Sequence, residues 1–402
     1  MTDHSASTTD LSARGAARVE WIRSRMPLLA RARAEFAERL PFAGHRIGMS
    51  LHLEPKTAVL LETLAAGGAE VVATGNHGST QDDIVAFLRG QGMTVFGSRD
   101  DDLDQHHRNV ASVAEAKPTI LLDNGADLAA LAAADPTGST SDTGIIGGTE
   151  ETTSGGLRLR GELAGRIPFP MIVINDSLLK AIGENKHAVG QSVVESFMRI
   201  TNLMVNSKRF VVFGYGWCGR GVAQYLRALG GKVAVVEVDE IKAFEAAMDG
   251  FRVDTADGLA EWGQVFITAT GHPGVLTAPF FEKVADGAVL ANCGHFPWEI
   301  DVPALRAYAI GSTVLDDAIE RLDLPGGRHV ILIADGRMFN LAGREPKGNS
   351  LESMDLGFLL QSLSLERVAT AADTLTLGAQ PVPEDIDREI ARRMLAALSA
   401  AR

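Results

Sequence analysis

A short stretch, residues 210–219, constrains the fold of this 402-residue chain more than any other. The apolar residues at 210–213 suit a strand that is buried on both faces. The sequence Gly-Tyr-Gly-Trp-Cys-Gly follows without a spacer, so the pattern G-x-G-x-x-G stands between a predicted strand and a predicted helix at 220–229. In that position the pattern is typical of the phosphate-binding turn of a dinucleotide-binding α/β domain.

The three glycines of this turn have separate tasks. Gly214 allows the tight turn, Gly216 lets the backbone approach a pyrophosphate, and Gly219 lets the helix pack closely on the strand. The helix directs its unpaired N–H groups and the positive end of its dipole at the phosphates. Glu237, near the end of a second predicted strand at 232–238, lies about 20 residues past the motif, where a carboxylate accepts both ribose hydroxyls and repels a 2′-phosphate. We therefore expect NAD rather than NADP; the alternative is a glycine turn in another α/β fold.

The overall composition is that of an ordinary globular protein. Hydrophobic residues make up 46% and charged residues 22%, and the length suits two or three domains. The net charge of −13 argues against a nucleic-acid-binding surface. There is no apolar run near the roughly 20 residues of a membrane span, and the polar start does not resemble a signal peptide, so we expect a cytoplasmic protein without a membrane partner. Two cysteines, Cys218 and Cys293, are too few for a disulfide framework, and we expect reduced thiols and no metal.

Strands and helices alternate along the chain. We expect strands at 46–53, 70–74, 94–96, 119–122, 171–174, 265–268, 289–292 and 329–334, and helices at 56–66, 80–90, 190–204, 350–365 and 384–397. This order predicts an α/β protein with two Rossmann-like parallel-sheet domains, each sheet covered by helices on both faces. We expect a disordered N-terminus (1–14), a substrate domain (15–186 with 350–402) and an inserted NAD-binding domain (187–349).

Polar clusters follow several of the predicted strands. They lie at 52–54, 76–82, 123–127 and 175–180. In open α/β sheets, ligands bind outside the carboxyl ends of the strands. These clusters are therefore the candidate site.

The clusters resemble, in order along the chain, those of the S-adenosyl-L-homocysteine hydrolases. The matching segments are SLHLE with KTA (50–58), STQD (79–82), TEETT (149–153), NDS with Lys180 (175–180), GYGWCGRG (214–221), NCGHF (292–296), Gly336-Arg337 and Asn340-Leu341. The first segment is similar to the shorter archaeal and thermophilic-bacterial branch of the family.

The resemblance implies an unusual chemistry. In the family, bound NAD oxidises the ribose 3′-hydroxyl of a nucleoside, the ketone acidifies the C4′ proton, homocysteine leaves from C5′, water adds, and the ketone is reduced back. Such a reaction requires a closed, water-poor site between two domains that close on a small-molecule nucleoside. The resemblance also leads us to expect a homodimer or homotetramer.

Site residues are implied position by position. Lys180 resembles the base for the 3′-hydroxyl and Glu184 its acidic partner, while His52 and His295 resemble the two active-site histidines. The implied substrate contacts are Glu54, Thr57, Glu151, Asn175 and Asn349. The implied cofactor contacts, besides the glycine turn and Glu237, are Thr152, Thr153, Ser154, Asn185, Thr270 and Asn340. Alternatives remain open: Lys180 as an exposed helix lysine, Glu151 as a helix cap, and either histidine as a strand-end residue with its bonds satisfied.

Several positions depart from the family pattern. Asn124 stands where the family has an aspartate assigned to proton transfer at C4′, and an amide is neither a general acid nor a general base. Glu184 replaces an aspartate, and Asn349 replaces a histidine that the family has near the adenine. The family's C-terminal tail, which reaches a neighbouring subunit's NAD, is missing.

Because these departures spare the oxidation residues, our first interpretation is a diverged paralogue. It would use 3′-oxidation for another outcome, such as epimerisation or other chemistry at C5′. The alternatives are ordinary hydrolysis of S-adenosyl-L-homocysteine or its inosine analogue, and a silent NAD-binding regulator.

Overall fold

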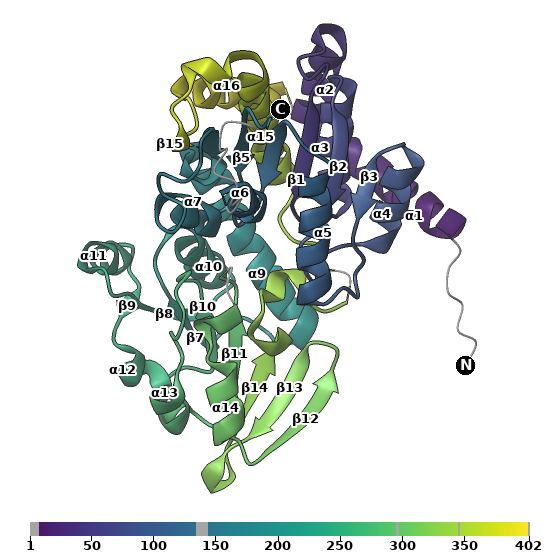
Figure 1. Ribbon diagram of the computed structural model, residues 1–402. Helices are drawn as coiled ribbons and strands as arrows, with labels where there is room; N and C mark the ends of the chain where they lie inside the picture. The colour runs from purple at the N-terminus through teal and green to yellow at the C-terminus, as the bar shows by residue number, and fades with distance from the viewer. Residues whose placement is uncertain (1–7, 134–143, 295–296, 345, 401–402) are drawn as a thin grey trace. The chain divides into compact units, whose positions relative to one another are not determined.

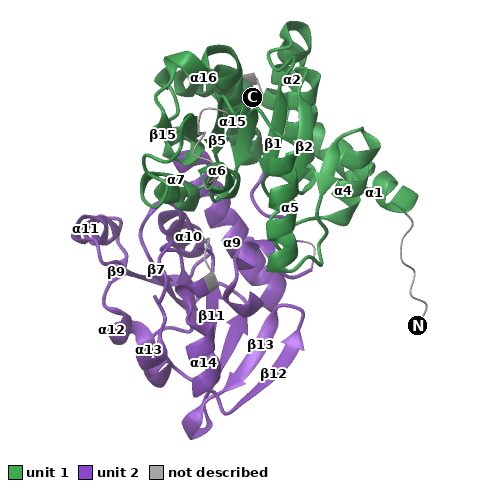
Figure 2. Ribbon diagram, viewed as in Figure 1, with its two compact units in different colours: residues 1–180, 351–402 green, residues 181–350 purple. Residues whose placement is uncertain are grey.

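The computed structural model describes residues 8–133, 144–294, 297–344 and 346–400 (Figure 1). The chain divides into two compact units, unit 1 with residues 1–180 and 351–402 and unit 2 with residues 181–350 (Figure 2). Unit 2 therefore begins at Ala181 rather than at residue 187, and it ends at Ser350 rather than at residue 349.

Unit 1 contains a seven-stranded sheet in the order β15-β6-β5-β4-β1-β2-β3, and all of its pairs are parallel. The strands are β1 (Arg46–Ser50), β2 (Glu70–Thr74), β3 (Thr94–Phe96), β4 (Ile120–Asp123), β5 (Gly147–Glu150), β6 (Pro170–Val173) and β15 (Gly378–Pro381). The helices are α1 (Thr8–Arg23), α2 (Pro27–Arg39), α3 (Pro55–Ala66), α4 (Asp82–Gly90), α5 (Leu103–Glu115), α6 (Asp127–Ala133), α7 (Thr153–Arg160), α8 (Leu178–Lys180), α15 (Leu351–Ala371) and α16 (Glu384–Ala400).

This sheet is buried on both faces because helices pack on each side of it, and successive strand residues point to opposite sides. In β4, Ile120 and Leu122 pack into the core formed with α3, α4 and α15, whereas Leu121 packs into the core formed with α5, α6 and α7. The continuous apolar strands of the sequence follow from this arrangement.

The N-terminal helix corrects one expectation, because α1 begins at Thr8 within the stretch expected to be disordered. Arg14 and Arg18 both donate to the buried carboxylate of Asp83 in α4, at 3.0 and 2.7 Å. Gly15 lies against α4 so closely that a Cβ there would stand 2.2 Å from the Asp83 carbonyl oxygen. Tertiary contacts therefore order a segment whose composition predicts disorder.

Unit 2 contains an eight-stranded sheet in the order β12-β13-β14-β11-β10-β7-β8-β9. The strands are β7 (Arg209–Phe213), β8 (Lys232–Val236), β9 (Arg252–Val253), β10 (Val265–Thr268), β11 (Ala288–Asn292), β12 (Gly311–Asp316), β13 (Ile319–Asp323) and β14 (His329–Ile333). The helices are α9 (Val189–Thr201), α10 (Trp217–Ala228), α11 (Glu240–Met248), α12 (Ala256–Ala260), α13 (Ala278–Lys283) and α14 (Val302–Tyr308), preceded by a π-helix (Ala181–Ala188).

The second sheet is parallel except at one edge, where β12, β13 and β14 pair antiparallel (Figure 1). We did not predict strands β12 and β13 from the sequence. Neighbouring residues of β7 again face opposite cores: Val212 packs with α9 and α10, and Val211 packs with α12, α13 and α14. Across the described residues, no helix combines the length and apolarity needed to cross a bilayer.

Candidate functional site

In unit 1 the predicted polar clusters meet at one edge of the sheet. His52 and Glu54 follow β1, Asn124 follows β4, Glu151 follows β5, and Asn175 follows β6. Because these strands are parallel, their carboxyl ends lie along the same edge, which is where open α/β sheets bind ligands.

A buried lysine forms the centre of this edge. The Lys180 amine at the end of α8 donates to the Glu151 carboxylate, and the Gln361 amide of α15 donates to the other oxygen of the same carboxylate. Lys180 is 3% exposed, so the alternative of an exposed helix lysine is wrong. The cap of α7 is Thr152, whose hydroxyl accepts from the Gly155 N–H at 3.0 Å, so Glu151 is not the helix cap either.

Two further contacts cross this edge. The Nδ1 atom of His52 lies 2.6 Å from the Ser79 hydroxyl oxygen. The Asn76 amide donates to the Asn124 side-chain oxygen at 3.0 Å. Residues of the segment after β2 thus contact both the His52 ring and the Asn124 amide, which departs from the family pattern.

A pair of buried carboxylates, which the sequence analysis missed, lies beside Asn124. Asp123 and Glu150 are register partners at the ends of β4 and β5. Glu150 accepts from the backbone N–H groups of Gly125 and Ala126 at 3.0 and 2.9 Å, so it fixes the turn after Asn124. Burial, together with the charge of its neighbours, raises the pKa of Asp123 to about 7 and the pKa of Glu150 to about 8. Burial therefore favours the protonated form of both carboxyl groups relative to exposed aspartate and glutamate.

Several buried polar atoms near this edge have no hydrogen-bond partner among the residues that the structure describes. They are Ser50 Oγ, Thr74 Oγ1, Asn76 Oδ1, Thr149 Oγ1 and Gln361 Oε1. Unsatisfied buried polar atoms are rare in folded proteins, so a group of them at a strand edge fits a ligand rich in hydroxyl groups and ring nitrogens.

The other predicted substrate contacts have local partners. The Thr57 hydroxyl is buried and donates to the His52 carbonyl at 2.6 Å. The Glu54 carboxylate pairs with the Lys56 amine at 3.0 Å. Their contacts with a substrate stay predictions.

In unit 2 the glycine turn has the geometry that its sequence predicts. Gly214 has a φ of 93°, and a Cβ on Gly219 would lie 2.0 Å from the Gly214 carbonyl oxygen. A Cβ on Gly216 would meet no described protein atom within 4 Å, which leaves this backbone open to a phosphate. The Glu237 carboxylate accepts the Tyr215 N–H of the turn at 2.6 Å. These residues fit the pyrophosphate and the adenosine ribose of NAD.

A second polar group in unit 2 links three predicted residues through Ser192, which the sequence analysis missed. Asn349 donates to Glu184 at 3.4 Å, Ser192 donates to Asn349 at 3.3 Å, and Asn340 donates to Ser192 at 3.2 Å. The buried Oδ1 of Asn340 has no partner among the described residues, as expected for an atom that contacts a ligand. Glu184 and Asn185 belong to the π-helix, an element found frequently at functional sites.

The remaining predicted residues are placed as follows. Thr152 and Ser154 lie 3.1 Å apart through their hydroxyls at the start of α7, and Thr153 beside them is exposed. Their contact with a cofactor stays a prediction, as does the role of Glu184 as partner of Lys180. His295 lies outside the described residues.

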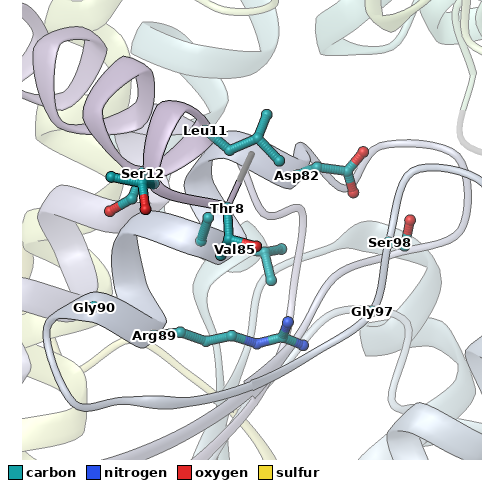
Figure 3. A pocket seen from close by; sticks show the side chains of 11 residues that line it. Thr8, Leu11, Ser12, Asp82, Val85, Arg89, Gly90, Gly97 and Ser98 are labelled. Carbon is teal, nitrogen blue, oxygen red and sulfur yellow. The ribbon is translucent and has the colours of Figure 1, made fainter. Parts of the chain in front are cut away.

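The described residues also include two cysteines, one of them within the glycine turn, and a surface hollow. Cys218 and Cys293 are not joined in a disulfide, and burial raises the pKa of the Cys293 thiol. A hollow of about 530 Å³ lies between α1 and α4. Figure 3 shows side chains that line it, among them Leu11, Val85 and Arg89. Asp82, which lines the hollow, belongs to the predicted polar cluster at 76–82, but we assigned none of the lining residues to catalysis or to contacts with substrate or cofactor.

The site matches a known family. Residues 185–345 match the family model described as "S-adenosyl-L-homocysteine hydrolase, NAD binding domain", and residues 3–142 match "S-adenosyl-L-homocysteine hydrolase". The chain belongs to the S-adenosyl-L-homocysteine hydrolase family. It is therefore an NAD-dependent enzyme of adenosylhomocysteinase type, as the sequence analysis predicted.

Three relatives of this family are similar over nearly the whole chain. The S-inosyl-L-homocysteine hydrolase of Methanopyrus kandleri is 42% identical, covering 96% of this chain and 91% of its own. The adenosylhomocysteinase of Archaeoglobus fulgidus is 40% identical, with 95% and 93% covered. The adenosylhomocysteinase of Aquifex aeolicus is 39% identical, with 96% and 93% covered. The archaeal and thermophilic-bacterial resemblance is thus confirmed, and two purine thioethers appear among the names of the relatives.

Proposed function

We propose that this protein hydrolyses the thioether of an S-(purine nucleosidyl)-L-homocysteine to the nucleoside and homocysteine. The observation that carries the proposal is the buried Lys180–Glu151–Gln361 group at the carboxyl edge of the unit 1 sheet, in a chain of this family. The relatives named as S-adenosyl- and S-inosyl-L-homocysteine hydrolases support hydrolysis over our first interpretation of a diverged paralogue.

The residues of unit 1 supply binding and proton transfer. In its unprotonated form the Lys180 amine takes the proton of the ribose 3′-hydroxyl, and Glu151 orients the amine and accepts a hydrogen bond from a ribose hydroxyl. Gln361 fixes the Glu151 carboxylate, because its amide holds the oxygen that Lys180 does not contact. When bound, NAD supplies the hydride acceptor for this oxidation and returns the hydride at the end.

Transfer of the C4′ proton requires a titratable group, and the amide of Asn124 is not one. His52 is the group that fits, because an imidazole titrates near neutral pH and the Ser79 hydroxyl fixes its ring. The Asn76–Asn124 amide pair then forms a polar wall without exchanging a proton.

We propose that the Glu54–Lys56 pair contacts the purine base of the substrate. A carboxylate accepts from the exocyclic amine of adenine, and an ammonium group donates to the carbonyl of hypoxanthine. Since the pair carries both groups, we propose that it accommodates either base.

A second candidate function rests on Asn124 alone. If no other group moves the C4′ proton, 3′-oxidation leads to another outcome, such as epimerisation of the ribose. Homo-oligomerisation and a cytoplasmic location are likewise proposals, supported by the resemblance and by the sequence.

One experiment separates these functions. The NAD-loaded protein is incubated in D2O with S-adenosyl-L-homocysteine, S-inosyl-L-homocysteine, adenosine and inosine, and proton NMR is combined with a thiol assay. Homocysteine release with exchange at C4′ supports hydrolysis. Exchange at another ribose carbon without thiol release supports the epimerase. If neither exchange nor thiol release occurs, both proposed activities are contradicted.

A further inference from the structure

One buried carboxylate in unit 2 has no part in the function proposed above. Glu299 ends a short 3-10 helix, Pro297–Glu299, and is 0% exposed. One of its oxygens accepts from the backbone N–H and the hydroxyl of Thr270 at 3.0 and 2.8 Å, and the other accepts from the Gly271 N–H at 2.8 Å. A buried charge that receives three donors fixes the turn which carries those donors.

That turn contacts the dinucleotide-binding loop directly. A Cβ on Gly214 would lie 2.9 Å from the Ala269 carbonyl oxygen and 3.2 Å from the Thr270 methyl carbon. The turn after β10 therefore forms the wall next to the first glycine of the phosphate-binding turn, and a shift of Thr270 alters the space beside Gly214.

The same carboxylate supports the chain after β11. A Cβ on Gly294 would lie 1.6 Å from one Glu299 oxygen, so the backbone here passes directly over the carboxylate. The Asn292 side-chain oxygen accepts from the Gly294 N–H at 2.8 Å and from the Thr268 hydroxyl at 2.9 Å. Glu299 and Asn292 together connect the ends of β10 and β11.

The strand order shows which half of the dinucleotide lies above this wall. The sheet runs β11-β10-β7-β8, and Glu237, the acid for the adenosine ribose, follows β8. Because a dinucleotide crosses the sheet at β7, its other half extends over β10 and β11. Glu299 would therefore lie beneath the nicotinamide half of a bound dinucleotide.

We propose that Glu299 is a positioning residue that shapes the nicotinamide half of the NAD site through the Thr270–Gly271 turn. The proposal rests on the binding of NAD and is independent of which thioether the protein cleaves. Glutamine in place of Glu299 has one acceptor oxygen and one amide that faces an N–H donor, so at least one of the three hydrogen bonds is lost.

The test measures binding in the absence of any nucleoside, by titration calorimetry of the apoprotein with NAD and with ADP. ADP carries only the adenosine half. For Glu299→Gln we expect the Kd for NAD to rise about ten-fold, because NAD must then order a turn that the Glu299 carboxylate holds in place in the wild type, with the Kd for ADP changed less than about two-fold. The matched control is Glu282→Gln, which removes an exposed carboxylate of the same unit and should change neither Kd.

A second variant keeps the test decisive if Glu299→Gln does not fold. Thr270→Val keeps the backbone N–H that donates to Glu299 and removes the hydroxyl, which donates to Glu299 and accepts the His272 N–H at 3.0 Å, and we expect its Kd for NAD to rise about three- to ten-fold with ADP unaffected. An unchanged Kd for NAD in the folded variants would overturn the proposal. Equal weakening of NAD and ADP would also overturn it, because that result indicates general damage to unit 2.

Discussion

The assignment of the C4′ proton to His52 gives the most demanding prediction. In His52→Asn, the asparagine amide can still meet the Ser79 hydroxyl, which now lies 2.6 Å from Nδ1, but it cannot exchange a proton. General acid–base groups typically accelerate a reaction by about 10²- to 10⁴-fold. The loss of His52 should therefore raise the activation free energy of homocysteine release by about 3–5 kcal/mol. Oxidation at C3′ relies on Lys180 and should continue.

Two variants serve as controls for this change. His45 precedes β1 and contacts the Thr119 hydroxyl at 3.2 Å, so His45→Asn is the same substitution at the opposite end of the strand and should leave the rate unchanged. Asn124→Asp keeps an acceptor for the Asn76 amide at 3.0 Å. If His52 moves the proton, this variant should change cleavage by less than about three-fold.

The assay follows two signals in one stopped-flow experiment. The near-ultraviolet absorbance of bound NADH reports oxidation, and a thiol reagent reports homocysteine release. We expect His52→Asn to retain the first signal and to lose the second. If His52→Asn cleaves at the wild-type rate while Asn124→Asp gains ten-fold or more, the amide limits the reaction and the reasoning is refuted in favour of the second candidate function.

Further predictions concern the base, the cofactor and stability. Lys180→Ala should abolish the NADH absorbance on mixing with nucleoside, because the 3′-hydroxyl keeps its proton; accumulation at the wild-type rate would exclude Lys180 as the base. Glu237→Ala should weaken NAD and reduce its preference over NADP, measured by competition binding, whereas equal wild-type affinities would contradict the role of Glu237. Because burial raises the pKa values of Asp123 and Glu150 to about 7 and about 8, above their unfolded values, the folded protein retains protons that the unfolded chain has lost. Stability should therefore fall as pH rises from about 5 to 7, by about 1.4 kcal/mol per pH unit for each retained proton, in urea unfolding. A slope that is the same in Asp123→Asn would contradict this origin.

The sequence by itself determined the elements whose information is local. The turn at Gly214, Gly216 and Gly219 depends on backbone conformations and close approaches encoded by consecutive residues, so the pattern identified it. The apolar parallel strands were likewise evident, because burial on both faces leaves a continuous apolar run. By contrast, β12 is exposed along its whole length and carries no such signal.

The tertiary structure alone decided which side chains form hydrogen bonds with each other and which carboxyl groups are neighbours. Gln361 meets Glu151 across 210 residues of sequence, and Glu299 meets Thr270 across 29. The acidic pair beside Asn124 exists because β4 and β5 are neighbours in register, which the order of elements does not specify. Sequence patterns record which residues follow one another, whereas burial and pairing depend on which strand ends the sheet brings to one edge. That is why the candidate residues were found from the sequence and their partners were not.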